Sequence, residues 1–204
     1  GYDDVIVGDV FSEYYFNDGG YSGNFVTTYA SYVVFGKASG FDATLRASDL
    51  DGTNGFSIGI GPVVSAAGDV NGDGLDDLIV SSGGDGYVIF GKTSSFDAKL
   101  KVSDLDGKNG FRIKGNAIHV SNAGDFNGDG FDDLIVSSGG DGYVIFGKAS
   151  GFNATLNLSD LDGTNGFRLD GLESDYWKGS SVSGAGDINA DGFDDLIIGD
   201  PKDG

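Results

Sequence analysis

Cysteine and methionine are absent from this chain, and proline, histidine and tryptophan occur only twice, once and once among 204 residues. The absence of cysteine excludes disulfide bonds, thiolate nucleophiles and thiolate metal sites. Basic residues are few as well: 12 Lys and Arg stand against 32 Asp and Glu, for a formal net charge of −20. Because this charge repels phosphate groups, we expect neither nucleic acid nor an anionic membrane as a partner.

Long apolar runs are also missing, and the sequence shows neither a signal peptide nor a stretch that could span a bilayer. It opens on Gly1 instead of methionine, which is typical of a processed or excised segment. Glycine, in contrast, is abundant, with 38 residues beside 39% hydrophobic and 12% aromatic content. Many glycines without sustained helical periodicity favour short strands joined by tight turns. The sequence therefore predicts an all-β protein with a substantial core.

One nine-residue pattern, Asp-x-Asn-x-Asp-Gly-[Leu/Phe]-Asp-Asp, occurs three times. Oxygens at positions 1, 3 and 5 can converge on one hard cation, and the backbone carbonyl of position 7 and the carboxylate of position 9 complete its shell. The glycine at position 6 tolerates the positive φ of a sharp turn. Three structural Ca²⁺ sites are therefore predicted, with the ligands Asp69, Asn71, Asp73, Leu75, Asp77, Asp125, Asn127, Asp129, Phe131, Asp133, Asp187, Asn189, Asp191, Phe193 and Asp195. Acidic surface turns without a metal are the alternative, but such turns rarely repeat this calcium spacing.

Neighbouring carboxylates such as Asp76 and Asp77 could also be proposed as the acid and base of a glycosidase. The same pair recurs in every copy at the metal spacing, however, and position 9 is already assigned to the cation. The single histidine, His119, lies in a predicted strand without a recognisable nucleophile motif. We therefore expect no catalytic activity.

The loops recur at a regular distance, beginning at Asp69, 56 residues later at Asp125 and a further 62 residues later at Asp187. Internal repeats of this size indicate propeller blades or solenoid coils. Within residues 116–171 we predict four strands, at 118–123, 133–137, 142–148 and 166–169. Four antiparallel strands per repeat are typical of a β-propeller blade.

The repeats divide the chain into a partial blade at 1–59, with an aromatic-rich insert at 9–31, two blades at 60–115 and 116–171, and a partial blade at 172–204. About three and a half blades cannot close a ring. We therefore expect a fragment of a longer repeat array. A subunit that associates through its open blade edges is the alternative.

Three elements recur in order along the chain: the Ala-Gly-Asp triplets that begin at Ala67, Ala123 and Ala185, the loops, and the Phe-Gly pairs that begin at Phe35, Phe90 and Phe146. Together they resemble FG-GAP repeats, the blades of the integrin α-subunit propeller and its bacterial relatives. The resemblance implies a seven-bladed propeller with calcium in the hairpin between the first two strands of a blade. The Gly-Ala-Pro element of these repeats is degraded here, for example to Ser-Ser-Gly at Ser81 and Ser137. Integrin-specific ligand recognition therefore does not carry over.

Four aromatic residues are candidates for ligand contact: Tyr14, Tyr15 and Tyr21 in the insert, and Trp177. Aromatic side chains on loops of a rigid scaffold can stack on sugars or dock proteins. Packing on a neighbouring blade is the competing interpretation.

Extracellular calcium concentrations match weak sites of this kind, so we expect a secreted or cell-surface protein. Its predicted function is a binding or adhesion scaffold whose partner is an extracellular protein or carbohydrate. The alternatives are a lectin-like carbohydrate-binding propeller and a structural subunit of a surface layer or filament.

Overall fold

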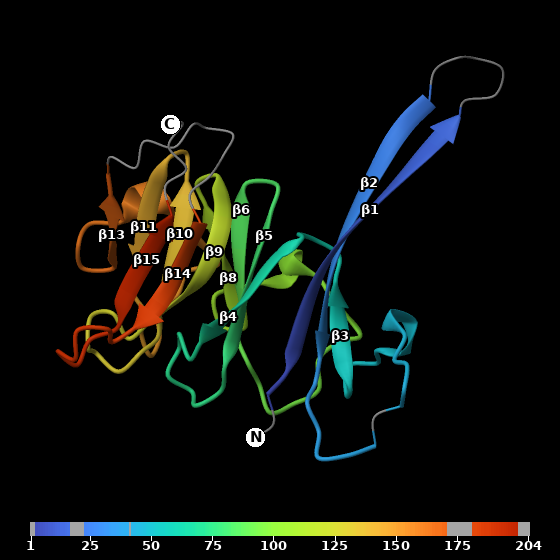
Figure 1. Cartoon of the computed structure of the whole chain (residues 1–204), viewed down its shortest axis with the longest axis horizontal. Coiled ribbons are helices and arrows are strands. Elements are labelled where there is room, and N and C mark those ends of the chain that lie inside the picture. Colours follow the sequence, from blue (N-terminus) through green and yellow to red (C-terminus); the bar gives the residue numbers. More distant parts are fainter. Residues whose placement is uncertain (1–2, 17–22, 41, 171–180, 200–204) are drawn as a thin grey trace. The chain divides into compact units, whose positions relative to one another are not determined.

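The computed structural model describes residues 3–16, 23–40, 42–170 and 181–199. They form two compact units, one of Gly1–Pro62 with Ser95–Lys101 and the other of Val63–Ser94 with Val102–Gly204. Strands dominate both units (Figure 1), and the only helices among the described residues are single 3-10 turns, so the all-β prediction is confirmed. No helix in these ranges has the length and apolarity to cross a membrane.

The first unit contains one four-stranded sheet in the order β1-β2-β3-β7. Its strands are β1 (Val5–Phe16), β2 (Gly23–Val34), β3 (Gly55–Ile58) and β7 (Lys99–Leu100), and the 3-10 turn η1 is Ala47–Asp49. The insert, expected as a loop, instead lengthens a hairpin, because β1 and β2 pair without interruption from Val5↔Val34 to Phe16↔Gly23. The prediction of a loop was wrong: the insert breaks the repeat pattern, but it is rich in Val, Tyr and Phe, which favour strands.

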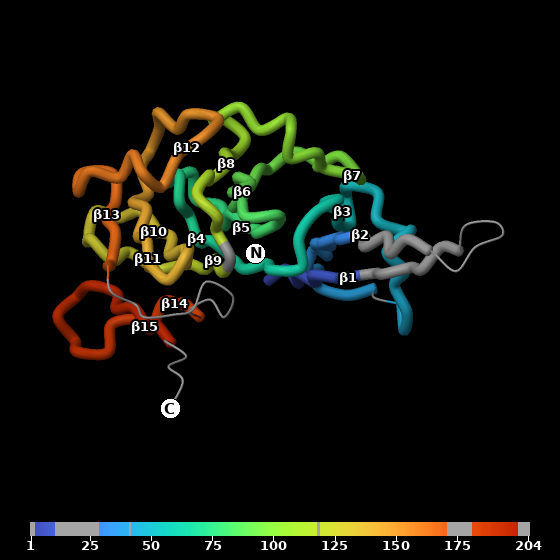
Figure 2. The backbone as a smooth tube through the Cα atoms, turned by 90° about the horizontal axis from the view of Figure 1, so that it is seen from above, coloured from blue at the N-terminus to red at the C-terminus, as the bar shows by residue number. Residues whose placement is uncertain are grey.

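The second unit contains a five-stranded sheet in the order β12-β8-β6-β5-β4, a four-stranded sheet in the order β13-β11-β10-β9, and the hairpin β14-β15. The bounds are β4 Val63–Gly68, β5 Asp77–Ser82, β6 Asp85–Ile89, β8 Gly110–Lys114, β9 Ala117–Gly124, β10 Asp133–Ser138, β11 Asp141–Ile145, β12 Thr155–Asn157, β13 Gly166–Leu169, β14 Ser181–Gly186 and β15 Asp195–Gly199, with 3-10 turns η2 Val102–Asp104 and η3 Leu158–Asp160. Figure 2 shows the two sheets and the hairpin following one another through this unit. Among the first strands of successive repeats, β9 packs against both β4 and β14, as the innermost strands of neighbouring propeller blades do.

The four strands predicted within 116–171 correspond to β9, β10, β11 and β13, so the antiparallel four-stranded blade is confirmed. The continuous apolar run in β10 is buried on both faces, with Leu134, Ile135 and Val136 each at 0% exposure. Together with Phe111 and Ile113 of β8 and other residues of the two sheets, Leu134 and Val136 form the hydrophobic core of the second unit.

One element was not predicted. The long connection between the third and fourth strands of a repeat contains a short strand that pairs in parallel with the outermost strand of the preceding repeat. In this way β7 adds to β3 and β12 adds to β8. We call the segments 95–101 and 151–157, which carry these two strands, straps. The sequence predicted only a structured turn in this connection.

Candidate metal centres

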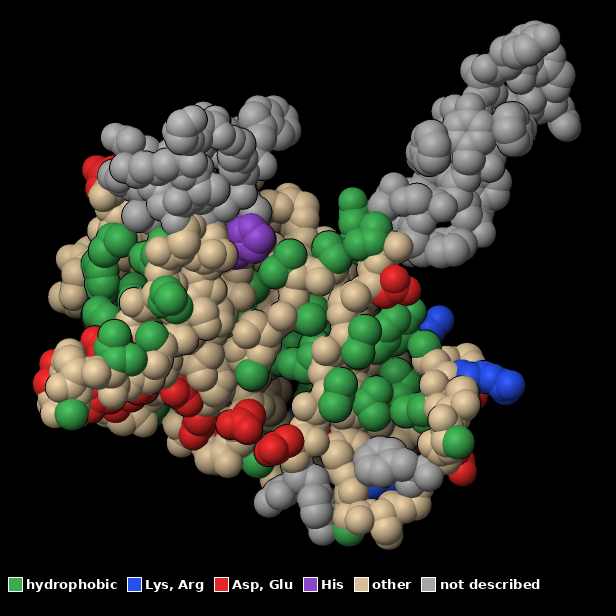
Figure 3. Space-filling view, viewed as in Figure 1, with side chains coloured by type: hydrophobic (Ala, Val, Ile, Leu, Met, Phe, Trp, Pro, Cys, Tyr) green, Lys and Arg blue, Asp and Glu red, His purple; other side chains and the backbone are tan. Residues whose placement is uncertain are grey.

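The three acidic loops connect the first and second strands of consecutive repeats, β4 to β5, β9 to β10 and β14 to β15. Figure 1 shows all three at the same end of the second unit, and Figure 3 shows Asp side chains gathered there. This is the hairpin position in which the resemblance placed the cation.

Within each loop, the backbone turns around the side-chain oxygens of the predicted ligands. In the first loop, Asp69 Oδ1 and Asn71 Oδ1 both accept hydrogen bonds from Asp73 N, at 3.0 and 2.9 Å. Asp69 Oδ2 also accepts a hydrogen bond from Gly74 N at 2.8 Å. Because two of these oxygens contact one amide, positions 1 and 3 lie on the same side of the turn. The second loop repeats the arrangement bond for bond, and position 1 of the third loop does the same.

Position 9 of the first two loops connects each of them to the Phe-Gly turn that follows it. Asp77 Oδ1 accepts a hydrogen bond from Gly91 N at 2.8 Å, and Asp77 Oδ2 accepts one from Val70 N at 3.0 Å. Gly91 has no room for a side chain, since a Cβ there would lie 2.6 Å from the carbonyl oxygen of Asp76. The Phe-Gly pair therefore recurs because this glycine donates to the last carboxylate of the loop at close range.

The second loop leaves one buried carboxylate oxygen without a partner. Asp133 is fully buried; its Oδ1 accepts a hydrogen bond from Gly147 N at 2.8 Å, while its Oδ2 has no hydrogen-bond partner. Burial raises the pKa of Asp133 to about 7 despite the hydrogen bond from Gly147, and it raises the pKa of Asp77 to about 7 in the same way. An unpaired buried carboxylate is costly, and a cation in the loop would offset that cost.

The chemistry of the loop residues fits a hard cation, because each set offers three carboxylates, one amide and a backbone carbonyl. As they stand, the described residues contain no group of three or more Asp, Glu or His side chains already gathered for a metal. Their carboxylates instead accept backbone hydrogen bonds. A bound ion would therefore have to draw the side chains of positions 1, 5 and 9 together.

The first acid of the second and third Asp-Asp pairs, to which the sequence assigned no role, connects consecutive loops. Asp132 Oδ2 accepts a hydrogen bond from Asp69 N at 2.7 Å, and Asp194 Oδ2 accepts one from Asp125 N at 2.8 Å. The glycine of the Ala-Gly-Asp triplet makes space for this carboxylate, because a Cβ on Gly68 would lie 2.2 Å from Asp132 Oδ2. The signal in the sequence for this role was that the Ala-Gly-Asp triplet and the Asp-Asp pair keep the same spacing in every repeat.

The third loop departs from the other two at position 4, where Ala190 replaces glycine and adopts a φ of 62°. In the first two loops this position is Gly72 or Gly128, and the Phe at position 7 of the next loop covers it. A Cβ on Gly72 would lie 2.3 Å from the ring of Phe131.

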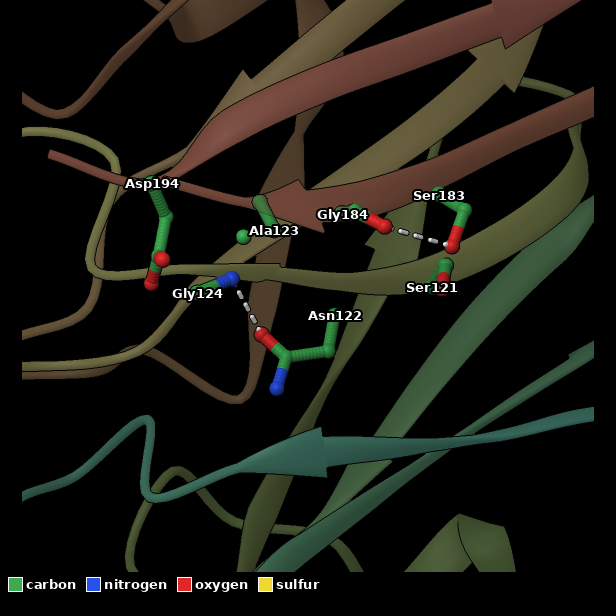
Figure 4. Close-up of a pocket in the computed structure, with 8 residues that line it drawn as sticks. Ser121, Asn122, Ala123, Gly124, Ser183, Gly184 and Asp194 are labelled. Carbon is green, nitrogen blue, oxygen red and sulfur yellow. Dashed lines mark hydrogen bonds between the residues drawn. The ribbon is translucent and has the colours of Figure 1, made fainter. Parts of the chain in front are cut away.

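A small hollow of about 240 Å³ lies beside the second loop, between β9 and β14 (Figure 4). Asn122 Oδ1 accepts a hydrogen bond from Gly124 N at 2.6 Å, and Ser183 donates to the carbonyl oxygen of Gly184 at 3.0 Å. The lining residues are small or polar and none is aromatic. The hollow therefore offers no surface for stacking a sugar ring.

Of the four aromatic candidates, only two have a described backbone. Tyr14 and Tyr15 lie in β1, where they pair with Phe25 and Asn24, but their side chains are not described. Tyr21 and Trp177 lie outside the described residues. His119 lies in β9, as predicted, partly buried, and its backbone amide donates to Ser137 Oγ at 3.3 Å.

Comparison with known proteins identifies the repeats. The family model named FG-GAP repeat matches residues 61–94 and 119–151. These ranges include the first two acidic loops and two of the three Phe-Gly pairs. The chain carries FG-GAP repeats.

The chain is also distantly similar to integrin α subunits. It is 30% identical over 161 residues to integrin alpha pat-2 of Caenorhabditis briggsae and 29% identical over 161 residues to integrin alpha pat-2 of Caenorhabditis elegans. Each match covers 69% of this chain but 12% of the relative. The chain thus corresponds to a small part of these relatives.

Proposed function

We propose that this chain is part of an extracellular, calcium-stabilised FG-GAP propeller that serves as a non-catalytic scaffold for binding or adhesion. The observation that carries the calcium proposal is the buried, unpartnered Oδ2 of Asp133 at the last position of an acidic loop. The recurrence of that loop in three consecutive repeats supports it. The adhesion proposal is supported by the FG-GAP repeats and the similarity to integrin α.

Calcium binding is expected to contribute substantially to stability. With a dissociation constant of ~10⁻⁴ M and ~1 mM free ion, each site adds about 1.4 kcal/mol, and three sites add about 4 kcal/mol. For a chain of this size, that raises Tm by about 10 °C.

The experiment that tests the calcium proposal is thermal unfolding with 1 mM CaCl₂ or with EDTA, followed by a titration with MgCl₂. We expect Tm to fall by about 10 °C in EDTA and magnesium to restore little of it, because Mg²⁺ requires shorter, octahedral coordination. Native mass spectrometry in calcium buffer should show three bound ions. The same Tm in calcium and in EDTA would refute the proposal.

The partner is proposed to be an extracellular protein. Immobilised FG-GAP chain should retain extracellular-matrix or cell-surface proteins in calcium and release them in EDTA. If the calcium-free chain retained the same proteins equally well, partner binding would not depend on calcium in the acidic loops.

A structural subunit of a surface layer or filament is the second candidate, because large apolar side chains of the β14-β15 hairpin are exposed. Calcium-dependent polymerisation, seen by sedimentation, would favour it. A glycan array tests the lectin-like alternative.

A further inference from the structure

The outermost strands of the first two repeats are completed by straps from the repeats that follow them. Ser57 N of β3 donates to the carbonyl oxygen of Ala98, and Arg112 N of β8 donates to that of Ala154, both at 3.0 Å. The two straps share the sequence Phe-[Asp/Asn]-Ala-x-Leu. Their backbone positions on the two strands are therefore equivalent.

Each strap also stacks one phenylalanine ring on the strand that it joins. The Phe96 ring lies 4.4 Å from that of Phe56 at an interplanar angle of 14°, and the Phe152 ring lies 4.8 Å from that of Phe111 at 10°. Phe56 is 1% exposed, and Phe111 is 0% exposed. The straps thus help to close the hydrophobic cores of the two blades.

The backbone at the start of each strap lies directly against a glycine in a turn of the preceding repeat. A Cβ on Gly52 would lie 1.9 Å from the carbonyl oxygen of Phe96, and a Cβ on Gly107 would lie 2.3 Å from that of Phe152. Both glycines have a φ of 90°. Only a residue without a side chain lets the strap backbone approach this turn.

The third repeat has the same receiving surface, but no described residue fills it. Gly163 adopts a φ of 91°, and a Cβ there would meet nothing within 4 Å. Within residues 42–170 and 181–199, no strand pairs with the outer edge of β13. Leu169 is 37% exposed, whereas its equivalents Ile58 and Ile113 are 0% exposed.

The ring of Phe167 also lacks the stacked partner of its equivalents. Its described neighbours, Phe126 and Phe146, are tilted by 38° and 56°, with centroids 5.8 and 6.1 Å away. One face of the ring is thus left for a strap phenylalanine. Two filled examples in the same chain define what the surface accepts.

We propose that the outer edge of β13 is a docking site for an extended segment of the sequence Phe-[Asp/Asn]-Ala-x-Leu, supplied by the remainder of the FG-GAP repeat that β14 and β15 begin. The segment adds as a parallel strand, with its phenylalanine on Phe167, its leucine beside Leu169, and its first carbonyl oxygen over Gly163. The backbone amide of Arg168 donates to the carbonyl oxygen of its alanine. This goes beyond the calcium-stabilised scaffold and does not depend on the metal.

A second copy of this chain is the competing source of the segment. Residues 41–45 have the sequence Phe-Asp-Ala-Thr-Leu, and Leu45 is 44% exposed. In the second copy, however, that segment follows β1 and β2. Strand β1 corresponds in sequence to β15 of the acceptor, because β1 begins directly after one Asp-Asp pair and β15 begins at the second acid of another. Seating the copy in register would superimpose β1 on β15. The remainder of the repeat that β14 and β15 begin avoids this conflict, because it adds no second copy of these two strands.

The test uses the full chain and a synthetic peptide with the sequence of residues 149–160, followed by hydrogen exchange and NMR. A short parallel strand with two apolar anchors is expected to bind with a dissociation constant of about 1 mM. At several millimolar peptide, exchange of the Arg168 amide should slow by about fivefold, in proportion to the bound fraction. The amides of Ser57 and Arg112, whose strands already hold straps, serve as internal controls and should not change.

Two matched controls identify the contacts. A peptide with alanine in place of its phenylalanine should leave Arg168 exchange unchanged. The chain variant Gly163→Ala should no longer respond to the intact peptide, because its Cβ occupies the place of the phenylalanine carbonyl; its circular dichroism spectrum checks that it folds. An unchanged Arg168 amide in the parent chain at 5 mM peptide would overturn the proposal. So would a dimer that the Leu45→Ala variant abolishes, because the occupant would then be a second copy.

Discussion

The two most deeply buried acids in the second unit are the last residues of the first two loops. Asp77 and Asp133 are 3% and 0% exposed, and burial raises the pKa of each to about 7. In the unfolded chain these carboxyls have ordinary pKa values near 4. The calcium-free folded state therefore keeps protons that the unfolded state releases between about pH 4 and pH 7.

The first prediction is the resulting pH dependence. As far as these two groups are concerned, stability in EDTA should be greatest below about pH 4, and Tm should fall as pH rises through 7 and level off near pH 8. In calcium the ion replaces the proton, so the fall should be reduced or reversed. Calorimetry between pH 5 and pH 8 measures both trends. A calcium-free Tm that rises across this range would contradict the burial of unpaired carboxylates.

The second prediction concerns the variant Asp133→Asn, which replaces the buried carboxylate by a neutral amide. At pH 8 in EDTA, its Tm should equal or exceed that of the parent chain, because the cost of burying a charge is removed. In 1 mM calcium, it should lose about one third of the stabilisation by calcium, or about 1.4 kcal/mol. Asp76→Asn changes an exposed acid that is not a predicted ligand and is the matched control. It should alter neither melting curve.

The third prediction concerns Ala190, whose φ of 62° is unfavourable for a residue with a side chain. Glycine occupies this position in the first two loops, at φ values of 71° and 73°. The change Ala190→Gly should therefore stabilise the chain by about 1 kcal/mol, or raise Tm by about 2 to 4 °C. The reverse change Gly72→Ala should lower Tm, because it adds a Cβ against the Phe131 ring.

At the scale of the element, the strap is the feature that connects one repeat to the next in the sheets. Leu156 lies in register with Ile113 of β8 and is partly buried, while Leu45, at the same position of the first repeat, is exposed. Identical residues at equivalent sequence positions thus have different surroundings.

The fourth prediction follows from this difference. Leu156→Ala should cost about 2 kcal/mol, at the lower end for a leucine in a core, and should speed exchange of the Arg112 amide. Leu45→Ala should change stability by less than about 0.5 kcal/mol. Urea unfolding of both variants measures the difference. Equal losses would show that β12 contributes nothing through its contact with β8.

Most of the elements could be predicted from the sequence, and the reasons differ for those that could not. The continuous apolar run around Ile135 indicates strand β10 by itself, and the glycines at Gly139–Gly140 indicate the turn between β10 and β11. The strap strands β7 and β12 have two and three residues and pair with partners more than 40 residues away, so no local periodicity indicates them. The role of Asp132 likewise depends on a contact with the preceding loop.

At the scale of the whole molecule, the C-terminal hairpin and its loop expose large apolar side chains. Ile197 of β15 is 60% exposed, whereas its equivalents Ile79 and Ile135 are 0% exposed. Ile188 and Phe193 of the third loop are 76% and 47% exposed. Apolar surface of this kind favours association.

The fifth prediction is that the isolated chain associates as its concentration rises. Sedimentation velocity between 5 and 200 μM should show an increasing weight-average mass, and Ile197→Glu should reduce it. The variant Val182→Thr, in the neighbouring strand, is a control for a general loss of stability. A chain that stays monomeric throughout would refute this role of the hairpin.

The strap has a consequence for how genes of such proteins can grow. Each repeat both supplies a strap to the repeat before it and offers an edge to the repeat after it, so donor and acceptor are encoded about one period apart. A duplication of one full period therefore produces both halves of a new junction, wherever its ends fall. A deletion whose ends coincide with the first and last strands of one sheet does not match the repeat period. It removes the strap of one blade and leaves another strap without the strand with which it pairs. Lengthening or shortening the array should thus succeed only in whole periods.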